Sequence, residues 1–196
     1  MRQKRLKPDK RAIRSRTAVV AAFNRLMFEE GYDSLSVSAI ATAANVSRST
    51  FYQHFRNCDA VLSQSIGQLF ERLACACLRA TDDGEVARLC QHFWDGRRLA
   101  RAILAGRQGE LMAALLTDKL YAALKARPGR RRPAREEWLV KSVCVHFSWG
   151  SIGLLSAWLT GRLPATVQQV ASVLRSVAHV VFAAEAPLGF TVSVNR

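Results

Sequence analysis

The ten residues 46–55, VSRSTFYQHF, bring hydroxyl, guanidinium, phenol, amide and imidazole groups together in one short stretch. In a helix, Phe51 and Phe55 would lie one turn apart on the same side and could fix it to a core. The polar side chains would then occupy the remaining circumference. We therefore expect this stretch to present hydrogen-bonding groups to a partner.

Several of these side chains are suited to the edges of base pairs in a major groove of DNA. Arg48 can form a bidentate contact with guanine, and Gln53 can address adenine. Ser49 and Thr50 can contact base edges or a thymine methyl group. The pattern therefore predicts a helix that reads DNA, although a surface helical hairpin would show a similar polar face.

Other polar residues near this stretch are suited to the sugar-phosphate backbone. Tyr52 and His54 can reach phosphates or sugars, and Arg56 can add a charged phosphate contact. Ser36 and Ser47 are predicted at helix starts, where a hydroxyl group and free backbone amides favour a phosphate oxygen.

The elements that would position these residues are all helical. Residues 19–32 show an apolar stripe through Val19, Phe23 and Leu26, which Gly31 is expected to end. A short helix is predicted after Ser36 as N-cap. The break at 45–46 follows, where Asn45 can adopt a left-handed conformation, and a long helix is expected from Asn57 or Asp59.

The composition indicates a globular protein with an anionic partner. The chain has 196 residues, with 29 basic and 15 acidic side chains and a formal net charge of +14. Eight basic residues lie within residues 2–16, which we expect to form a mobile basic arm. No apolar run of membrane-spanning length or signal-peptide type is evident, so we expect a cytoplasmic protein.

Five cysteines lie within apolar helical patterns, which favours reduced thiols over disulfides. The pairs Cys90–His92 and Cys144–His146 do not suit a metal ion, because residues two apart on a helix point about 200° apart. We therefore expect neither a metal site nor a cofactor.

From residue 63 onward the chain reads as amphipathic helices, broken at 81–84, 105–109, 126–133 and 160–164. Two C-terminal segments carry helical stripes that suit either a core or a subunit interface. The stripe residues are Gly150, Gly153, Ala157, Val167, Val170, Leu174, Val177 and Val181.

Bulky and polarizable side chains in this part of the chain could line an effector pocket, although such residues also form ordinary cores. The expected pocket residues are Cys90, Phe93, Trp94, Phe147 and Ser151, with Trp149, Trp158, His92 and His146 as further candidates.

Residues 16–62, RTAVVAAFNRLMFEEGYDSLSVSAIATAANVSRSTFYQHFRNCDAVL, resemble the N-terminal domain of the tetracycline-repressor (TetR) family of transcription regulators. The resemblance implies DNA contacts at Ser36, Ser38, Ser47, Arg48, Ser49, Thr50, Tyr52, Gln53 and His54. Asn45 departs from the glycine usual in the turn, and Cys58 stands where a lysine often touches phosphate.

The C-terminal stretch HFSWGSIGLLSAWLTGRLPATVQQVASVL looks like the last two helices of the same family. The resemblance implies that these helices form a four-helix bundle in a homodimer, and that the helices before them hold an effector.

We therefore expect an all-α protein of four parts. They are a basic arm (1–16), a three-helix helix-turn-helix DNA-binding domain (17–62), a helical effector-binding and dimerisation domain (63–186) and a C-terminal tail (187–196). The predicted function is a repressor that binds a palindromic operator as a homodimer and is released by a small, mostly apolar effector.

Two other classes compete with this interpretation. An enzyme is disfavoured, because we find no phosphate loop, no paired carboxylates and no nucleophile motif. A basic helical protein at a membrane surface would also use the arm and an amphipathic first helix. The polar constellation from Arg48 to Gln53 favours DNA over a membrane.

Overall fold

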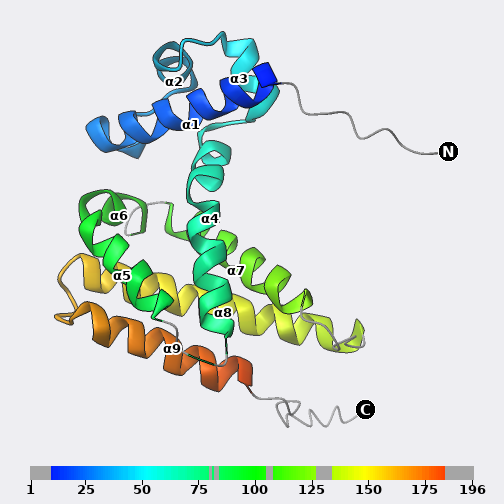
Figure 1. Cartoon of the computed structure of the whole chain (residues 1–196), viewed down its shortest axis with the longest axis vertical. Coiled ribbons are helices and arrows are strands. Elements are labelled where there is room, and N and C mark those ends of the chain that lie inside the picture. Colours follow the sequence, from blue (N-terminus) through cyan, green and yellow to red (C-terminus); the bar gives the residue numbers. More distant parts are fainter. Residues whose placement is uncertain (1–9, 80, 82–83, 105–107, 127–133, 184–196) are drawn as a thin grey trace, which may run out of the picture. The chain divides into compact units, whose positions relative to one another are not determined.

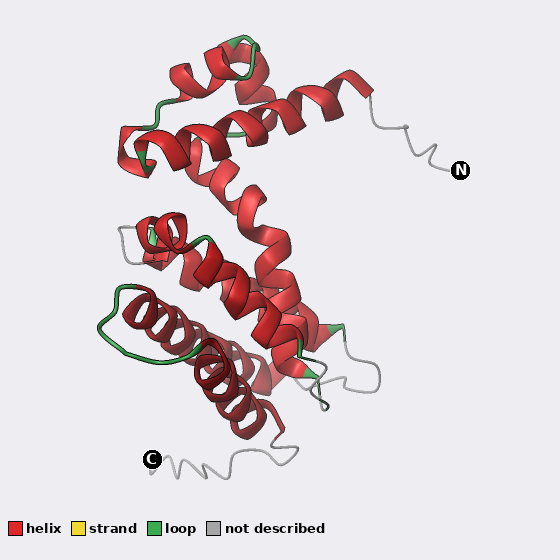
Figure 2. Cartoon of the chain, turned by 60° about the vertical axis from the view of Figure 1, so that its left-hand side comes forward, coloured by secondary structure: helices red, strands yellow, loops and turns green. Residues whose placement is uncertain are grey.

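The computed structural model describes residues 10–79, 81, 84–104, 108–126 and 134–183. All regular elements within these residues are helical, as the sequence predicted (Figures 1 and 2). The chain divides into two compact units, Met1–Gln68 and Leu69–Arg196.

The first unit contains a long helix, a short helical pair and the start of a second long helix. Its elements are α1 (Lys10–Glu30), the 3-10 turn η1 (Tyr32–Ser34), α2 (Val37–Ala43), α3 (Arg48–His54) and the beginning of α4 (Cys58–Leu78). The predicted stripe of Val19, Phe23 and Leu26 is buried in this unit. Gly31 ends α1 with φ +83°, and its N–H donates to the carbonyl of Met27 at 3.1 Å.

The turn between α2 and α3 explains how Asn45 replaces a glycine. Ala44 is the C-cap of α2, and Asn45 follows with φ +52°. The N–H of Asn45 donates to Thr42, and the N–H of Val46 donates to Ala41, both at 3.0 Å. These two bonds form a Schellman motif, whose left-handed position accepts Asn at a smaller steric cost than most other side chains.

The expected basic arm, residues 1–16, overlaps the first helix. Residues 1–9 lie outside the described residues, but Lys10–Arg16 form the first two turns of α1. The prediction of an arm reaching to residue 16 is therefore wrong for these seven residues. The expected C-terminal tail, 187–196, also lies outside the described residues.

Tyr32 joins the end of α1 to the start of α4. Its hydroxyl donates to a carboxylate oxygen of Asp59, and its ring meets that of Phe23 edge-on with centroids 6.2 Å apart. Burial, followed by the hydrogen bond to Asp59, raises the pKa of Tyr32. This joint holds the N-terminus of α4 against the three-helix core of unit 1.

The second unit contains the end of α4, then α5 (Glu85–Asp95), α6 (Arg97–Leu104), α7 (Gly109–Lys125), α8 (Ala134–Leu159) and α9 (Val167–Ala183). The predicted break at 160–164 falls between α8 and α9. Of the other predicted breaks, residues 82–83, 105–107 and 127–133 lie outside the described residues. One break was not predicted, at Gly96, where α5 ends and α6 begins.

Ion pairs and a tryptophan hydrogen bond help to fix the helices of unit 2. Arg72 on α4 binds Glu85 on α5 through Nε and Nη2, at 2.9 and 2.6 Å. The indole N–H of Trp158 donates to the carbonyl of Ala165 at 2.9 Å, which ties the end of α8 to the loop before α9.

Candidate nucleic-acid interface

Helix α3 is anchored to unit 1 by its two phenylalanines, as the sequence predicted. Phe51 and Phe55 are buried, with ring centroids 6.0 Å apart. The Tyr52 ring meets Phe51 edge-on at 5.7 Å, while 52% of Tyr52 remains exposed. The apolar side of α3 therefore fixes its orientation and leaves its polar side open.

The predicted DNA-contacting residues are brought together on α3 and at the starts of α2 and α3. Eight of the ten are exposed, and Thr50 and His54 are half-buried. The exposed residues are Ser36, Ser38, Ser47, Arg48, Ser49, Tyr52, Gln53 and Arg56.

Ser36 and Ser47 are both N-caps, as predicted. The hydroxyl of Ser36 accepts from the N–H of Ala39 at 3.1 Å, and that of Ser47 accepts from the N–H of Thr50 at 3.0 Å. Ser47 Oγ also lies 2.8 Å from Ser49 Oγ and 2.9 Å from Thr50 Oγ1. Each hydroxyl group can donate one hydrogen bond and accept others, so these three side chains can form one hydrogen-bond network at the start of α3.

The His54 ring pairs with a side chain on another helix of unit 1. Its Nε2 lies 2.7 Å from Ser15 Oγ on α1. No local pattern predicts this pair, since the two residues are 39 positions apart and on different helices.

Cys58 is half-buried at the first position of α4. Burial and the neighbouring Asp59 carboxylate raise the pKa of the Cys58 thiol, so the group is uncharged at neutral pH. It therefore supplies no positive charge in place of the lysine usual at this position. Asn57 caps the same helix, since its Oδ1 accepts from the N–H of Ala60 at 2.9 Å.

The stripe predicted along α9 mixes two faces of that helix. Val170 and Leu174 are only 1% and 2% exposed within the single chain, so they belong to its core, which is the other use that the sequence allowed for this stripe. Val177 is 45% exposed, and the exposed Val173 and Val180 were missed. The period alone could not separate the two faces, because α9 is apolar on adjacent sides.

The small residues predicted on α8 lie partly at the surface. Gly150 and Gly153 are exposed, and a Cβ atom added to either would meet nothing within 4 Å. Ala157 is half-buried. Packing within this chain therefore does not require glycine at 150 or 153.

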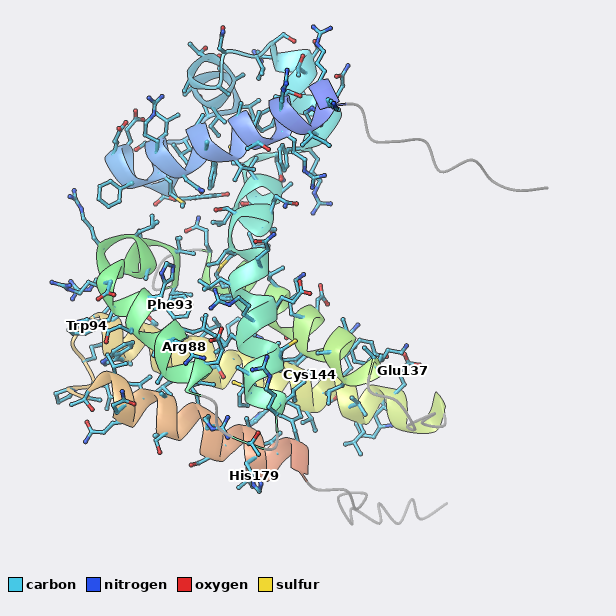
Figure 3. All side chains as sticks on the ribbon, in the orientation of Figure 1. Arg88, Phe93, Trp94, Glu137, Cys144 and His179 are labelled. Carbon is cyan, nitrogen blue, oxygen red and sulfur yellow. The ribbon has the colours of Figure 1, made fainter. Side chains whose placement is uncertain are left out.

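The residues predicted to line a pocket divide between the interior and the surface of unit 2. Cys90, Phe93, Phe147 and Ser151 are buried. Trp94 is half-buried on α5, where Figure 3 labels it beside Phe93. The further candidates His92, His146 and Trp149 are exposed, and their role in a pocket stays a prediction.

The aromatic residues of unit 2 pack in two separate pairs. Trp94 stacks on Trp158 with centroids 5.1 Å apart and planes 24° apart. Phe147 meets Phe182 on α9 edge-on at 5.2 Å. Burial raises the pKa of the Cys90 thiol to about 12, which keeps it protonated and apolar.

The paired cysteines and histidines point in different directions. Cys90 and Cys144 are buried while His92 and His146 are exposed, as the helical spacing predicted. Among the described residues there is no group of three metal-binding side chains.

Unit 1 has a helix-turn-helix pair that is anchored by buried phenylalanines and exposes a polar side, which is the arrangement of helix-turn-helix DNA-binding domains. Residues 19–64 match the model for bacterial regulatory proteins of the tetR family. This part of the chain is therefore a DNA-binding domain of the tetR type.

Solved structures of TetR regulators share the fold along most of the chain. One from Streptomyces coelicolor A3 is 19% identical with a TM-score of 0.60, and covers 92% of this chain and 99% of its own. One from Rhodococcus sp. RHA1 is 12% identical with a TM-score of 0.59, covering 90% and 100%. One from Streptococcus agalactiae is 21% identical with a TM-score of 0.55, covering 87% and 96%. Among proteins of curated function, none matches this chain.

Proposed function

We propose that this regulator is a cytoplasmic repressor that binds a palindromic operator as a homodimer and is released by a small, mostly apolar effector. The observation that carries the proposal is α3, whose polar side chains are exposed while Phe51 and Phe55 hold it to unit 1. In this proposal Arg48 and Gln53 read bases, and Arg56 binds phosphate.

Exposed apolar surface on α8 and α9 supports a homodimer. Val173, Val177 and Val180 are 46%, 45% and 74% exposed on α9. Gly150 and Gly153 leave open space on α8, where a helix of a second copy could approach closely. In a dimer with two-fold symmetry, the two α3 helices would meet successive major grooves about 34 Å apart.

The interior of unit 2 supports an apolar effector. Cys90 and Phe93 on α5 and Phe147 on α8 are buried and apolar, and Ser151 offers a hydroxyl group. We propose that the effector binds among these residues and favours a conformation with lower operator affinity. Release then follows from the difference in effector affinity between the two states.

A protein at the membrane surface remains the alternative, and one helix bears on it. Residues Glu137–Leu159 of α8 are long and apolar enough to cross a bilayer, but half of the apolar window is buried within the protein. The core helix of a soluble domain meets the same criteria, so this helix does not favour the alternative. Binding to lipid vesicles compared with binding to a DNA duplex would separate the two proposals.

The direct test is a footprint on the DNA that flanks the coding sequence, followed by a screen of hydrophobic compounds. We expect protection of a palindrome, and we expect an active compound both to change tryptophan fluorescence and to remove the footprint. Absence of any protected sequence would contradict the operator proposal. A compound that binds unit 2 but leaves operator affinity unchanged would contradict the proposed coupling.

A further inference from the structure

The first turns of α1 lie beyond the hydrophobic core of unit 1. None of the residues Lys10–Ala18 is buried, and the first buried residue of the helix is Val19. The first turn contains no acidic residue, and basic side chains there oppose the helix dipole. Because none of these residues is buried, we expect this end of the helix to depend on contacts with other helices.

Two adjacent residues supply these contacts. Ser15 Oγ lies 2.7 Å from Nε2 of His54, the last residue of α3. Arg16 Nη2 donates to Gln64 Oε1 on α4 at 2.5 Å, and its guanidinium group lies over the Phe55 ring at 5.5 Å. The basic end of α1 is therefore tied to the end of α3 and to α4.

Ser15 is the partner of His54 and also contacts its own helix. Ser15 Oγ lies 3.1 Å from the carbonyl oxygens of Arg11 and Ala12. Which of Ser15 and His54 donates depends on the imidazole nitrogen that carries the proton, and either tautomer engages Nε2 with Ser15. His54 Nε2 is consequently used within unit 1.

We propose that the Ser15–His54 hydrogen bond is a positioning contact that holds the basic first turns of α1 beside α3, where Lys10 and Arg14 contact DNA phosphates. Both side chains are exposed, and Lys10 precedes Ser15 by five residues, about 7.5 Å along the helix axis. These charges extend the binding surface past the C-terminal end of α3. His54 then acts through α1 rather than on the DNA. The inference rests on the proposed DNA-reading role of α3.

The test uses the full chain and a 30-base-pair duplex of mixed sequence, with affinity measured across a series of salt concentrations. The slope of log K against log salt is negative, and each lost phosphate contact reduces its magnitude by about 0.9. The Lys10→Gln/Arg14→Gln variant should therefore reduce this magnitude by about 1.8 per bound protomer. Ser15→Ala should reduce the magnitude as well, although it removes no charge.

A matched control separates positioning from general effects on α1. Thr17→Ala removes another hydroxyl from the same helix, one that donates to the carbonyl of Ile13 at 3.0 Å. This variant should keep the wild-type slope. Ser15→Thr, which retains the hydroxyl group, should restore most of the slope, and Ser15→Ala should keep the wild-type circular dichroism spectrum.

The outcomes distinguish the inference from the proposed function. If His54→Ala, Ser15→Ala and their combination reduce the magnitude of the slope equally, the pair acts as one unit and the inference is supported. A wild-type slope for Ser15→Ala, or for the double charge variant, would overturn the inference while leaving the function of α3 intact. Failure of the wild-type protein to bind any duplex would instead overturn the proposed function together with the inference.

Discussion

A single charge on the exposed apolar face of α9 should dissociate the proposed homodimer. Val177 is the position to change, because 45% of it is exposed in the single chain and a surface substitution should leave the fold intact. In an isologous dimer, Val177→Glu introduces two carboxylates for each interface. We therefore expect the effect on association to be counted twice.

The magnitude follows from the desolvation of these carboxylates. If each glutamate that becomes buried against apolar surface costs about 2 kcal/mol, a low value for an unpaired charge, the dimer loses about 4 kcal/mol. At 1.4 kcal/mol for each factor of ten, the dimer dissociation constant should rise by roughly a thousandfold. Operator affinity should fall with it, because a monomer engages one half-site.

Sedimentation velocity across a concentration series measures the dissociation constant, and a gel-shift titration measures operator affinity. Gln168→Glu adds the same side chain on the polar side of α9 and should leave both unchanged. Leu174→Glu would not serve as a test, because Leu174 is 2% exposed and the charge would enter the core of its own unit. A Val177→Glu protein with the wild-type dissociation constant would refute our assignment of the interface.

Three further predictions concern α3, the turn before it and the start of α5. Arg48→Ala should reduce the free energy of operator binding by about 1–3 kcal/mol and relax the base preference at one base pair, whereas Arg56→Ala should weaken binding to all duplexes alike. Selection from a randomised duplex library measures both effects. An unchanged base preference for Arg48→Ala would contradict its role. Asn45→Gly should preserve stability while Asn45→Ala should lower it by about 1 kcal/mol in urea unfolding, because Asn45 has φ +52° and alanine tolerates that conformation poorly. The hydrogen bonds from Arg72 and Arg88 lower the pKa of Glu85, so the carboxylate contributes stability above its unfolded-state pKa and loses it as pH falls through the folded pKa. Glu85→Gln should therefore flatten the acid side of the stability profile, and an unchanged profile would show that these contacts contribute nothing.

Local signals predicted much of unit 1. Ser36 and Ser47 act as caps through bonds to residues three positions away, and Asn45 closes its turn through neighbours within five positions. Phe51 and Phe55 are fixed by the helical period alone. Such features depend only on residues close together in the chain, so they can be predicted from the local sequence.

The features that the sequence did not predict depend on distant partners. Helix α1 begins at Lys10, and the contacts that tie its first turns come from His54, Phe55 and Gln64, which no local pattern connects to Ser15 or Arg16. The two apolar faces of α9 are both aliphatic, and only the packing of unit 2 decides which one is covered. Leu174 and Val177 therefore differ in burial although both are apolar and one turn apart.

The stacked pair of Trp94 and Trp158 has a spectroscopic consequence. Indole rings whose centroids are 5.1 Å apart share their excited states, so this pair should give a coupled signal in the near-ultraviolet circular dichroism spectrum. The other two tryptophans, Trp138 and Trp149, are 66% and 51% exposed and would respond to any compound that adheres to the surface. Replacing those two by phenylalanine would leave an intrinsic reporter at the junction of α5 and α8. A change in its coupled signal would then register rearrangement inside unit 2 without a label.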